Sequence, residues 1–191
     1  MPADPLQFDM RQALQRWPRA LLEKYAGKLL PAGVLVPILI GDEGMSVLFT
    51  RRSASLSQHA GQVSFPGGRM EAGDANVQET ALRETFEEIG IEPQRVEVAG
   101  YLDTSPTVSG YAVTPVIGFV RAGYCLAIDR AEVDQVFEVP LAFLLQPDNV
   151  QTGVREFDGY PMPVAEFHYG EQRIWGATAH ILIMLRDRII Y

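Results

Sequence analysis

The sequence predicts one compact α/β sandwich, and three observations support this fold class. The chain has 191 residues, the length of a single domain, and is 47% hydrophobic but only 21% charged, so it can bury a core. Apolar, β-branched runs are interspersed with helical patterns, with no linker or internal repeat between them. A capped amphipathic helix lies near the middle of the chain. This composition excludes a disordered chain, and no apolar run approaches the ~20 residues of a membrane span.

The first predicted element is a helix at the N-terminus. Asp9-Met-Arg-Gln12 has the form of a capping box, and the helix that follows is interrupted at Pro18 and ends near Gly27. We therefore divide the chain into a helical extension, residues 1–30, and a single domain, residues 31–191.

A run of short strands follows this extension. Residues 34–40 are apolar and β-branched, which predicts a strand, and Pro37 within it indicates a bulge or a sheet edge. Residues 46–50 are its predicted partner across a Gly-rich turn. Further strands are predicted at residues 63–65, 96–102, 112–120 and 136–139. After Pro140 a short helix is expected at residues 141–145, then a loop at 146–160 and a last helix from Gly176 towards Arg188.

The central helix is the best defined element. Asn76-Val-Gln-Glu79 is a capping box, while Gly90 and Pro93 form a stop signal, so the helix is predicted at residues 77–89. At about 100° per residue, three carboxylates fall on one face, which we expect to be solvated. They are Glu84, Glu87 and Glu88. The opposite face, expected to dock on the core, carries Leu82, Phe86 and Ile89.

Charge is distributed unevenly along the chain. The net charge of −8 argues against binding to nucleic acid or to an anionic membrane. Half of it, −4, lies within residues 67–91, whereas residues 44–70 contain three arginines (Arg51, Arg52, Arg69) and no acid. Where these segments meet lies a Pro-Gly-Gly turn that ends in Gly67 and Gly68 and permits close approach of the backbone. This pattern suits a phosphate ester bound through a divalent metal ion and a guanidinium together.

The single cysteine, Cys125, cannot form an internal disulfide or a zinc cluster, which indicates a reducing compartment. The N-terminal residues lack the basic and apolar regions of a signal peptide. We expect a cytoplasmic protein without nucleic-acid or membrane partners.

The turn and helix resemble the Nudix hydrolases, whose box reads G-x5-E-x7-R-E-U-x-E-E-x-G-U, with U apolar. Residues 83–91, Arg-Glu-Thr-Phe-Glu-Glu-Ile-Gly-Ile, match this pattern except for Thr85 at the first apolar position. The front half departs: Asp74 stands where the pattern has Glu, and Arg83 follows Gly68 by fifteen residues instead of fourteen. A metal role for Asp74 is therefore left open.

Residues 48–68 are similar to the coenzyme A pyrophosphatase branch of that family, which carries L-L-T-x-R-S-x3-R-x3-G-x-V-x-F-P-G-G. The spacing holds throughout, with Phe49 in place of Leu and Ser57 in place of Arg. Residues 110–116 and 175–179 also look similar to this branch. The resemblance covers the chain from about residue 34 to the last helix and leaves residues 1–30 outside.

The resemblance implies a Nudix-type α-β-α sandwich around a mixed β-sheet (α+β) and a Mg²⁺- or Mn²⁺-dependent hydrolysis of a phosphoanhydride. It implies Glu84 and Glu88 as metal ligands, with Glu87 as a third ligand or as the base that orients water. Arg83 would hold Glu87 in place. The base varies within the family, so Glu132 and Glu138 also stay open.

The implied substrate is the diphosphate of coenzyme A or its derivatives, giving adenosine 3′,5′-bisphosphate and a 4′-phosphopantetheine product. Arg52 is the first candidate to bind this diphosphate. The further candidates are Arg51, Phe65, Gly67 and Gly68. Alternatives are hydrolysis of ADP-ribose, dinucleotides or nucleoside triphosphates and, from another class, a non-catalytic ligand-binding regulator. Oligomeric state, including a homodimer, is left open.

Overall fold

The computed structural model describes residues 27, 29–157 and 159–190. The strands are β1 (Leu30–Gly41), β2 (Gly44–Arg52), β3 (Val63–Ser64), β4 (Gly67–Arg69), β5 (Val96–Tyr101), β6 (Ser105–Pro106), β7 (Tyr111–Val120), β8 (Val133–Pro140), β9 (Val150–Phe157), β10 (Tyr160–Tyr169) and β11 (Gln172–Trp175). The helices are α3 (Val77–Ile89), α4 (Leu141–Leu145) and α5 (Ala177–Ile190), with short 3₁₀ turns at Pro93–Arg95 and Pro147–Asn149. The predicted N-terminal helix lies outside the described residues. None of the helices in the described ranges is long and apolar enough to cross a membrane.

Two sheets form the framework. The larger is mixed: β3, β2, β1, β7 and β5 lie in that order, β4 also pairs with β1, and β6 and β8 pair with β7 and β2. Only the β1–β7 pair in this described sheet is parallel. A smaller antiparallel sheet is ordered β11-β10-β9. The mixed α+β sandwich predicted from the sequence is confirmed.

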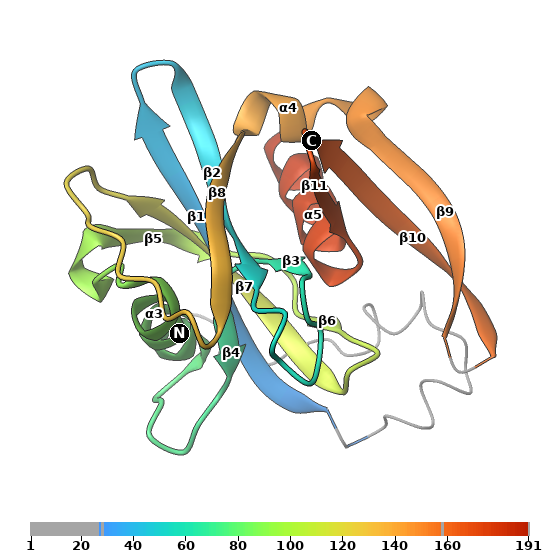
Figure 1. The fold of residues 1–191 in the computed structure, drawn as a ribbon, viewed down its shortest axis with the longest axis horizontal. Coiled ribbons are helices and arrows are strands. Elements are labelled where there is room, and N and C mark those ends of the chain that lie inside the picture. Colours follow the sequence, from blue (N-terminus) through green and yellow to red (C-terminus); the bar gives the residue numbers. More distant parts are fainter. Residues whose placement is uncertain (1–26, 28, 158, 191) are drawn as a thin grey trace, which may run out of the picture.

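The large sheet has α3 on one face and α5 on the other, with the small sheet beyond α5 (Figure 1). Because side chains alternate along a strand, β1 contributes to two cores. Val36 and Ile38 belong to the main core, which also contains residues of α5. Leu35 and Leu39 pack on the other side with Ala81 and Ile89 of α3. The central strands are therefore buried on both faces, which explains their continuous apolar sequences.

The segment that carries β3 and β4 lies between β1 and β2 in the sheet and positions the Pro-Gly-Gly turn. β2 pairs with β1 near their shared turn, but further along it pairs with β3, while the start of β1 pairs with β4. The β3–β4 segment therefore fills a gap where β1 and β2 separate. The backbone N–H of Leu35 closes this gap with a 2.9 Å hydrogen bond to the carbonyl of Pro66. The β3–β4 segment therefore brings the Pro-Gly-Gly turn to the middle of the sheet.

The interpretation of Pro37 as a bulge or sheet edge is wrong, because β1 is a central strand in continuous register with β7. The N–H of Leu35 points towards the β4 side, and alternation turns the nitrogen of Pro37 the same way. Residue 37 lies between the stretch that pairs with β4 and the stretch that pairs with β2. The missing N–H thus falls where the partner strand changes, so no ladder hydrogen bond is lost.

The predicted loop at residues 146–160 is also wrong. It contains a 3₁₀ turn and the strand β9, which pairs along its length with β10. Most of β9 is exposed on both faces, so its sequence lacks the apolar alternation that marks a strand. Strands β10 and β11 were not predicted either. The short helix at residues 141–145 is confirmed, and the last helix, expected from Gly176 towards Arg188, is observed as α5.

Candidate active site

Helix α3 occupies the predicted residues, Val77–Ile89, and both caps form. The side chain of Asn76 accepts a 3.0 Å hydrogen bond from the N–H of Glu79, and the Glu79 carboxylate accepts one from the N–H of Ala75. At the other end Gly90 adopts a left-handed φ of 79°, and its N–H donates to the carbonyl of Phe86. The helix is thus fixed at both ends by local sequence.

The helix packs unusually close to β1. A Cβ at Gly33 would lie 2.1 Å from the carbonyl oxygen of Val77, so only glycine permits this approach. One turn further along the helix, Ala81 is fully buried. Two small residues at the contact therefore bring the carboxylate-bearing helix down onto the sheet.

The docking face of α3 is rotated relative to the prediction. Phe86, expected in the core, is 49% exposed, whereas Glu88, expected on a solvated face, is only 3% exposed. The close contact at Gly33 and Ala81 accounts for this rotation, because it turns the helix side that carries Thr85 and Glu88 inward. Ile89 is buried as expected, and Leu82 is half-buried.

Glu84 and Glu88 both face the β4 turn. A Cβ at Gly68 would lie 2.4 Å from the carboxyl carbon of Glu84, and the N–H of Gly67 donates a 3.3 Å hydrogen bond to Glu88 Oε2. The two glycines of the turn therefore line a small space that holds two carboxylates.

Burial dominates the electrostatics of this pair. It raises the pKa of Glu88 to about 8, while the nearby Arg52 guanidinium and the Gly67 N–H act in the opposite direction. Burial also raises the pKa of Glu84, against the hydrogen bond from Arg83. Two partly desolvated carboxylates that repel each other favour either a proton or a bound cation.

Arg83 links the helix to the loop before it. Its Nε and Nη2 donate to the two carboxylate oxygens of Asp74 at 2.9 and 3.0 Å, and its Nη1 donates to Glu84 Oε1 at 2.9 Å and Glu87 Oε2 at 3.0 Å. The predicted Arg83–Glu87 pair thus forms. Glu87 itself is exposed, and its ion pair is with Arg83, whereas Glu88 is bonded to the turn.

Asp74 is buried, and its role is visible. Besides Arg83 it accepts hydrogen bonds from the hydroxyl of Thr80 and the N–H of Glu71, each at 2.9 Å. The hydrogen bonds from Arg83 hold the pKa of Asp74 far below its usual range. Asp74 therefore acts on Arg83. Asp74 reaches Arg83 although the loop is one residue longer than in the Nudix pattern and aspartate is shorter than the glutamate of that pattern.

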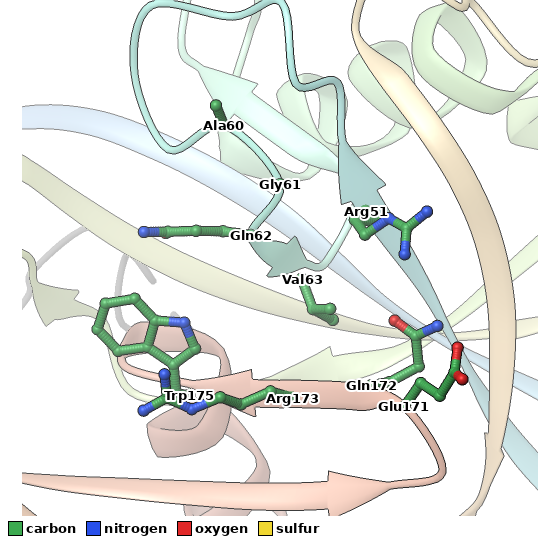
Figure 2. A pocket seen from close by; sticks show the side chains of 9 residues that line it. All are labelled: Arg51, Ala60, Gly61, Gln62, Val63, Glu171, Gln172, Arg173 and Trp175. Carbon is green, nitrogen blue, oxygen red and sulfur yellow. The ribbon is translucent and has the colours of Figure 1, made fainter.

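The two neighbouring arginines of β2 lie on different faces. Arg52 Nη1 lies 3.9 Å from Glu88 Oε1, and its buried Nε has no hydrogen-bond partner among the described residues. Arg51 lines a cavity of about 430 Å³ on the other face, together with residues of β3 and β11. Figure 2 shows Arg51 facing Gln172 and Glu171 there, with Trp175 at the far end. The structure brings Arg52, but not Arg51, to the carboxylate pair.

Phe65 does not line the candidate site. It is 3% exposed and stacks on Phe49 with ring centroids 5.0 Å apart, so its side chain belongs to the main core. Gly67 and Gly68 remain at the site through their backbone. Glu138, one of the alternative bases, accepts a hydrogen bond from the hydroxyl of Ser46, near the β1–β2 turn and away from the carboxylate pair.

The donor set fits a hard divalent cation. No group of three or more His, Cys, Asp and Glu side chains in the described part of the chain is arranged to hold a metal ion. The pair Glu84 and Glu88 nevertheless offers buried carboxylate oxygens, which Mg²⁺ and Mn²⁺ prefer, and such ions commonly complete their shell with waters and substrate phosphates. The unpartnered Arg52 Nε beside the pair suits one of those phosphates.

Sequence comparisons identify the family of the chain. Residues 29–180 match the NUDIX domain family. The chain belongs to the Nudix hydrolase family. Relatives named Nudix hydrolase NudL include one from Photorhabdus laumondii, 39% identical over 83% of this chain and 84% of its own length. Another, from Pectobacterium atrosepticum, is 41% identical over 83% of this chain and 82% of its own length.

Solved structures support the fold of this Nudix protein. The Nudix domain of Shewanella oneidensis NrtR, complexed with ADP ribose, aligns with a TM-score of 0.54 and 18% identity over 94% of this chain and 98% of that one. A MutT/nudix family protein from Enterococcus faecalis aligns with a TM-score of 0.53 and 15% identity over 92% and 70%. At such identities the likeness concerns the fold alone.

Proposed function

We propose that this Nudix protein hydrolyses a nucleoside diphosphate-linked substrate, most specifically the diphosphate of coenzyme A or its derivatives. The single observation that carries the proposal is the buried Glu84–Glu88 pair beside the unpartnered guanidinium of Arg52. Carboxylates that can hold a cation and an arginine that can bind a phosphate oxygen are the two parts that a diphosphate requires.

The residues of β2, β3 and β4 that carry the resemblance to coenzyme A pyrophosphatases support the finer assignment. Arg52 lies on the α3 side of β2, and Gly67 and Gly68 contact Glu88 and Glu84. Three members of the signature, Arg52, Gly67 and Gly68, therefore lie beside the carboxylate pair, whereas Phe65 packs in the main core. Relatives of similar length share the Nudix name.

Glu84 and Glu88 would hold Mg²⁺ or Mn²⁺, which neutralises charge on the diphosphate and activates water. Arg52 would bind a phosphate oxygen through the Nε that has no partner among the described residues and orient the phosphorus. Arg83, fixed by Asp74, would keep Glu84 in place through its 2.9 Å hydrogen bond. Hydrolysis then gives adenosine 3′,5′-bisphosphate and 4′-phosphopantetheine.

A substrate panel tests the proposal. The protein is incubated with Mg²⁺ and coenzyme A, ADP-ribose, NADH, a dinucleoside polyphosphate or dNTPs, and kcat/KM is compared. We expect coenzyme A or a thioester derivative to be the best substrate. If ADP-ribose or a nucleoside triphosphate has a tenfold higher kcat/KM, the coenzyme A assignment is wrong. No turnover of any member, with ligand binding retained, would indicate a regulator instead.

Dephospho-coenzyme A tests the effect of Ser57, which stands where the coenzyme A pyrophosphatase signature has Arg. Ser57 is exposed in the loop between β2 and β3 and supplies no cation where the signature has Arg. We therefore expect similar kcat/KM values for coenzyme A and its dephospho form. Ser57→Arg should favour coenzyme A, because a guanidinium there could contact the 3′-phosphate.

A further inference from the structure

The segment between β7 and β8 is fixed to the C-terminal end of α3. The N–H of Ala127 donates to the carbonyl of Ile89, and the N–H of Asp129 donates to the carbonyl of Glu88, both at 2.9 Å. Gly90 packs so closely here that a Cβ would lie 2.7 Å from the nitrogen of Ala127. Figure 1 shows this segment passing beside α3 before it enters β8.

Glu132 is the last residue of this segment, and its backbone is held from both sides. Its N–H donates to the carbonyl of Asp129, and its own carbonyl accepts a 2.8 Å hydrogen bond from the N–H of Ser53. The next residue, Val133, pairs with Arg52. Glu132 therefore stands between the end of α3 that carries Glu88 and the end of β2 that carries Arg52.

The carboxylate of Glu132 acts on the candidate site. In keeping with the backbone contacts that hold Glu132 beside β2 and the end of α3, its negative charge contributes to the raised pKa of both Glu84 and Glu88. The Glu132 side chain makes no hydrogen bond or ion pair with any described residue, and the residue is exposed to solvent. Glu87, in contrast, is already paired with Arg83.

A base needs to be close to the reacting water but free to take a proton. Within the described ranges Glu132 does not join Glu84 and Glu88 in a group that could hold a metal ion. Its backbone nevertheless lies between the strand end that carries Arg52 and the segment bonded to the carbonyl of Glu88. Glu138 lies towards the other end of β8, where it accepts the hydrogen bond from Ser46.

We propose that Glu132 is the general base of this site and accepts the proton of the attacking water; the inference rests on the proposed function. In the step, the water oxygen forms a bond to phosphorus and the bond from phosphorus to the bridging oxygen breaks. The bridging oxygen leaves with the electron pair on the departing phosphate. The water proton moves to Glu132, which releases it to solvent because the side chain is exposed.

The variant Glu132→Gln tests this role against the control Glu138→Gln, which lies on the strand that follows. With the best substrate of the panel and saturating Mg²⁺, we expect kcat of Glu132→Gln to fall roughly 10²- to 10⁴-fold, the range of general-base catalysis. The control should stay within about twofold of the wild type, because it lies outside the machinery. A wild-type kcat for Glu132→Gln would overturn the inference and leave the proposed function intact.

Mn²⁺ affinity, measured by calorimetry without substrate, separates a base from a ligand. Glu132→Gln should weaken Mn²⁺ binding by no more than about threefold, because only a nearby charge is lost. Glu88→Gln should weaken it at least about tenfold, because a coordinating oxygen is lost. An equally large loss in Glu132→Gln would make Glu132 a ligand and overturn its role as base. A wild-type protein that hydrolyses no member of the panel would instead refute the proposed function.

Discussion

The two arginines at the end of β2 are adjacent in sequence, yet they lie in opposite environments. Arg52 lies beside the buried carboxylate of Glu88, and its Nε is buried without a partner among the described residues. Arg51 lines a cavity with Glu171 and Trp175 on the face that carries β11. The alternation of side chains along a strand produces this separation. A cationic residue type alone therefore does not define a phosphate site; the face on which it lies does.

The two faces also differ in the charged groups that a ligand could contact. On the Arg52 face, Glu84 and Glu88 have raised pKa values, and the Arg52 guanidinium lies 3.9 Å from Glu88. On the other face, two arginines, Arg155 and Arg173, lie over the ring of Trp175, and Arg173 is paired with Glu166. Arg173 therefore already has an anionic partner, and both guanidinium groups lie against the indole ring. The Arg52 face therefore combines a candidate cation site with an available guanidinium.

The largest expected effect is on the Arg52 face. Glu88→Gln should lower kcat roughly 10³-fold, because the cation loses an oxygen ligand where charge develops. The matched control is Glu87→Gln, whose carboxylate is exposed and paired with Arg83; it should lose less than about tenfold. Steady-state kinetics at saturating Mg²⁺ measure both. Equal losses in the two variants would contradict the distinction between Glu88 and Glu87.

Glu88 also makes the stability of the metal-free protein depend on pH. Its pKa of about 8 in the folded state lies above that of an exposed glutamate, so the folded state binds the proton more tightly than the unfolded state. The free energy of unfolding should therefore fall as the pH rises from about 5 to about 8, and less so in Glu88→Gln. Mg²⁺ should raise the Tm of the wild type at the upper end of this interval. A wild-type Tm that rises with pH over this interval, relative to the variant, would contradict the burial of Glu88.

The next effect concerns Asp74, which holds Arg83 in place. Asp74→Asn should lower stability by about 2 kcal/mol, less than the ~3–5 kcal/mol of a fully buried pair because the Arg83 side chain is 25% exposed. It should also lower kcat about tenfold, since Arg83 no longer fixes Glu84. Denaturant unfolding and kinetics measure the two losses.

The control for this prediction is Asp148→Asn, an exposed acid without an ion pair among the described residues. This variant should change neither the free energy of unfolding nor kcat. Because the pKa of Asp74 is depressed, its contribution to stability is present above the ordinary pKa of aspartate and is lost as the pH falls below it. A stable, fully active Asp74→Asn protein would show that Arg83 needs no anchor.

The arginine pair gives the most direct test of the two faces. Arg52→Lys should raise KM about tenfold, because an ammonium group cannot replace the fork of N–H donors. Arg51→Lys should leave KM within about twofold, because its face carries no carboxylate pair. A larger increase for Arg51→Lys than for Arg52→Lys would place substrate in the 430 Å³ cavity instead.

The smallest expected effect is at Phe86. Phe86→Gln should change the free energy of unfolding by no more than about 0.5 kcal/mol, because this side chain is half exposed. Ile89→Ala on the same helix should cost about 3 kcal/mol, because Ile89 is fully buried. Urea unfolding compares the two. Equal losses would mean that α3 docks with the face predicted from its periodicity.

Strong local signals determine much of the site. Helix α3 needs only Asn76, Glu79 and Gly90 to set its ends, and all three act within a few residues of the chain. The Arg83–Glu87 pair likewise follows from the spacing of one helical turn. Such features are predictable because the partners are close in sequence.

Contacts between distant parts of the chain set the rotation of α3 and the position of Glu132. The inward rotation of α3, which buries Glu88 and exposes Phe86, depends on its contact with Gly33, which lies far earlier in the chain. The position of Glu132 depends on hydrogen bonds to Asp129 and Ser53. The small sheet left little trace in the sequence because most residues of β9 are exposed on both faces. Local sequence therefore specifies the ends of α3 and the spacing of its carboxylates, whereas packing between distant segments determines which carboxylate is buried and which of two adjacent arginines lies beside it.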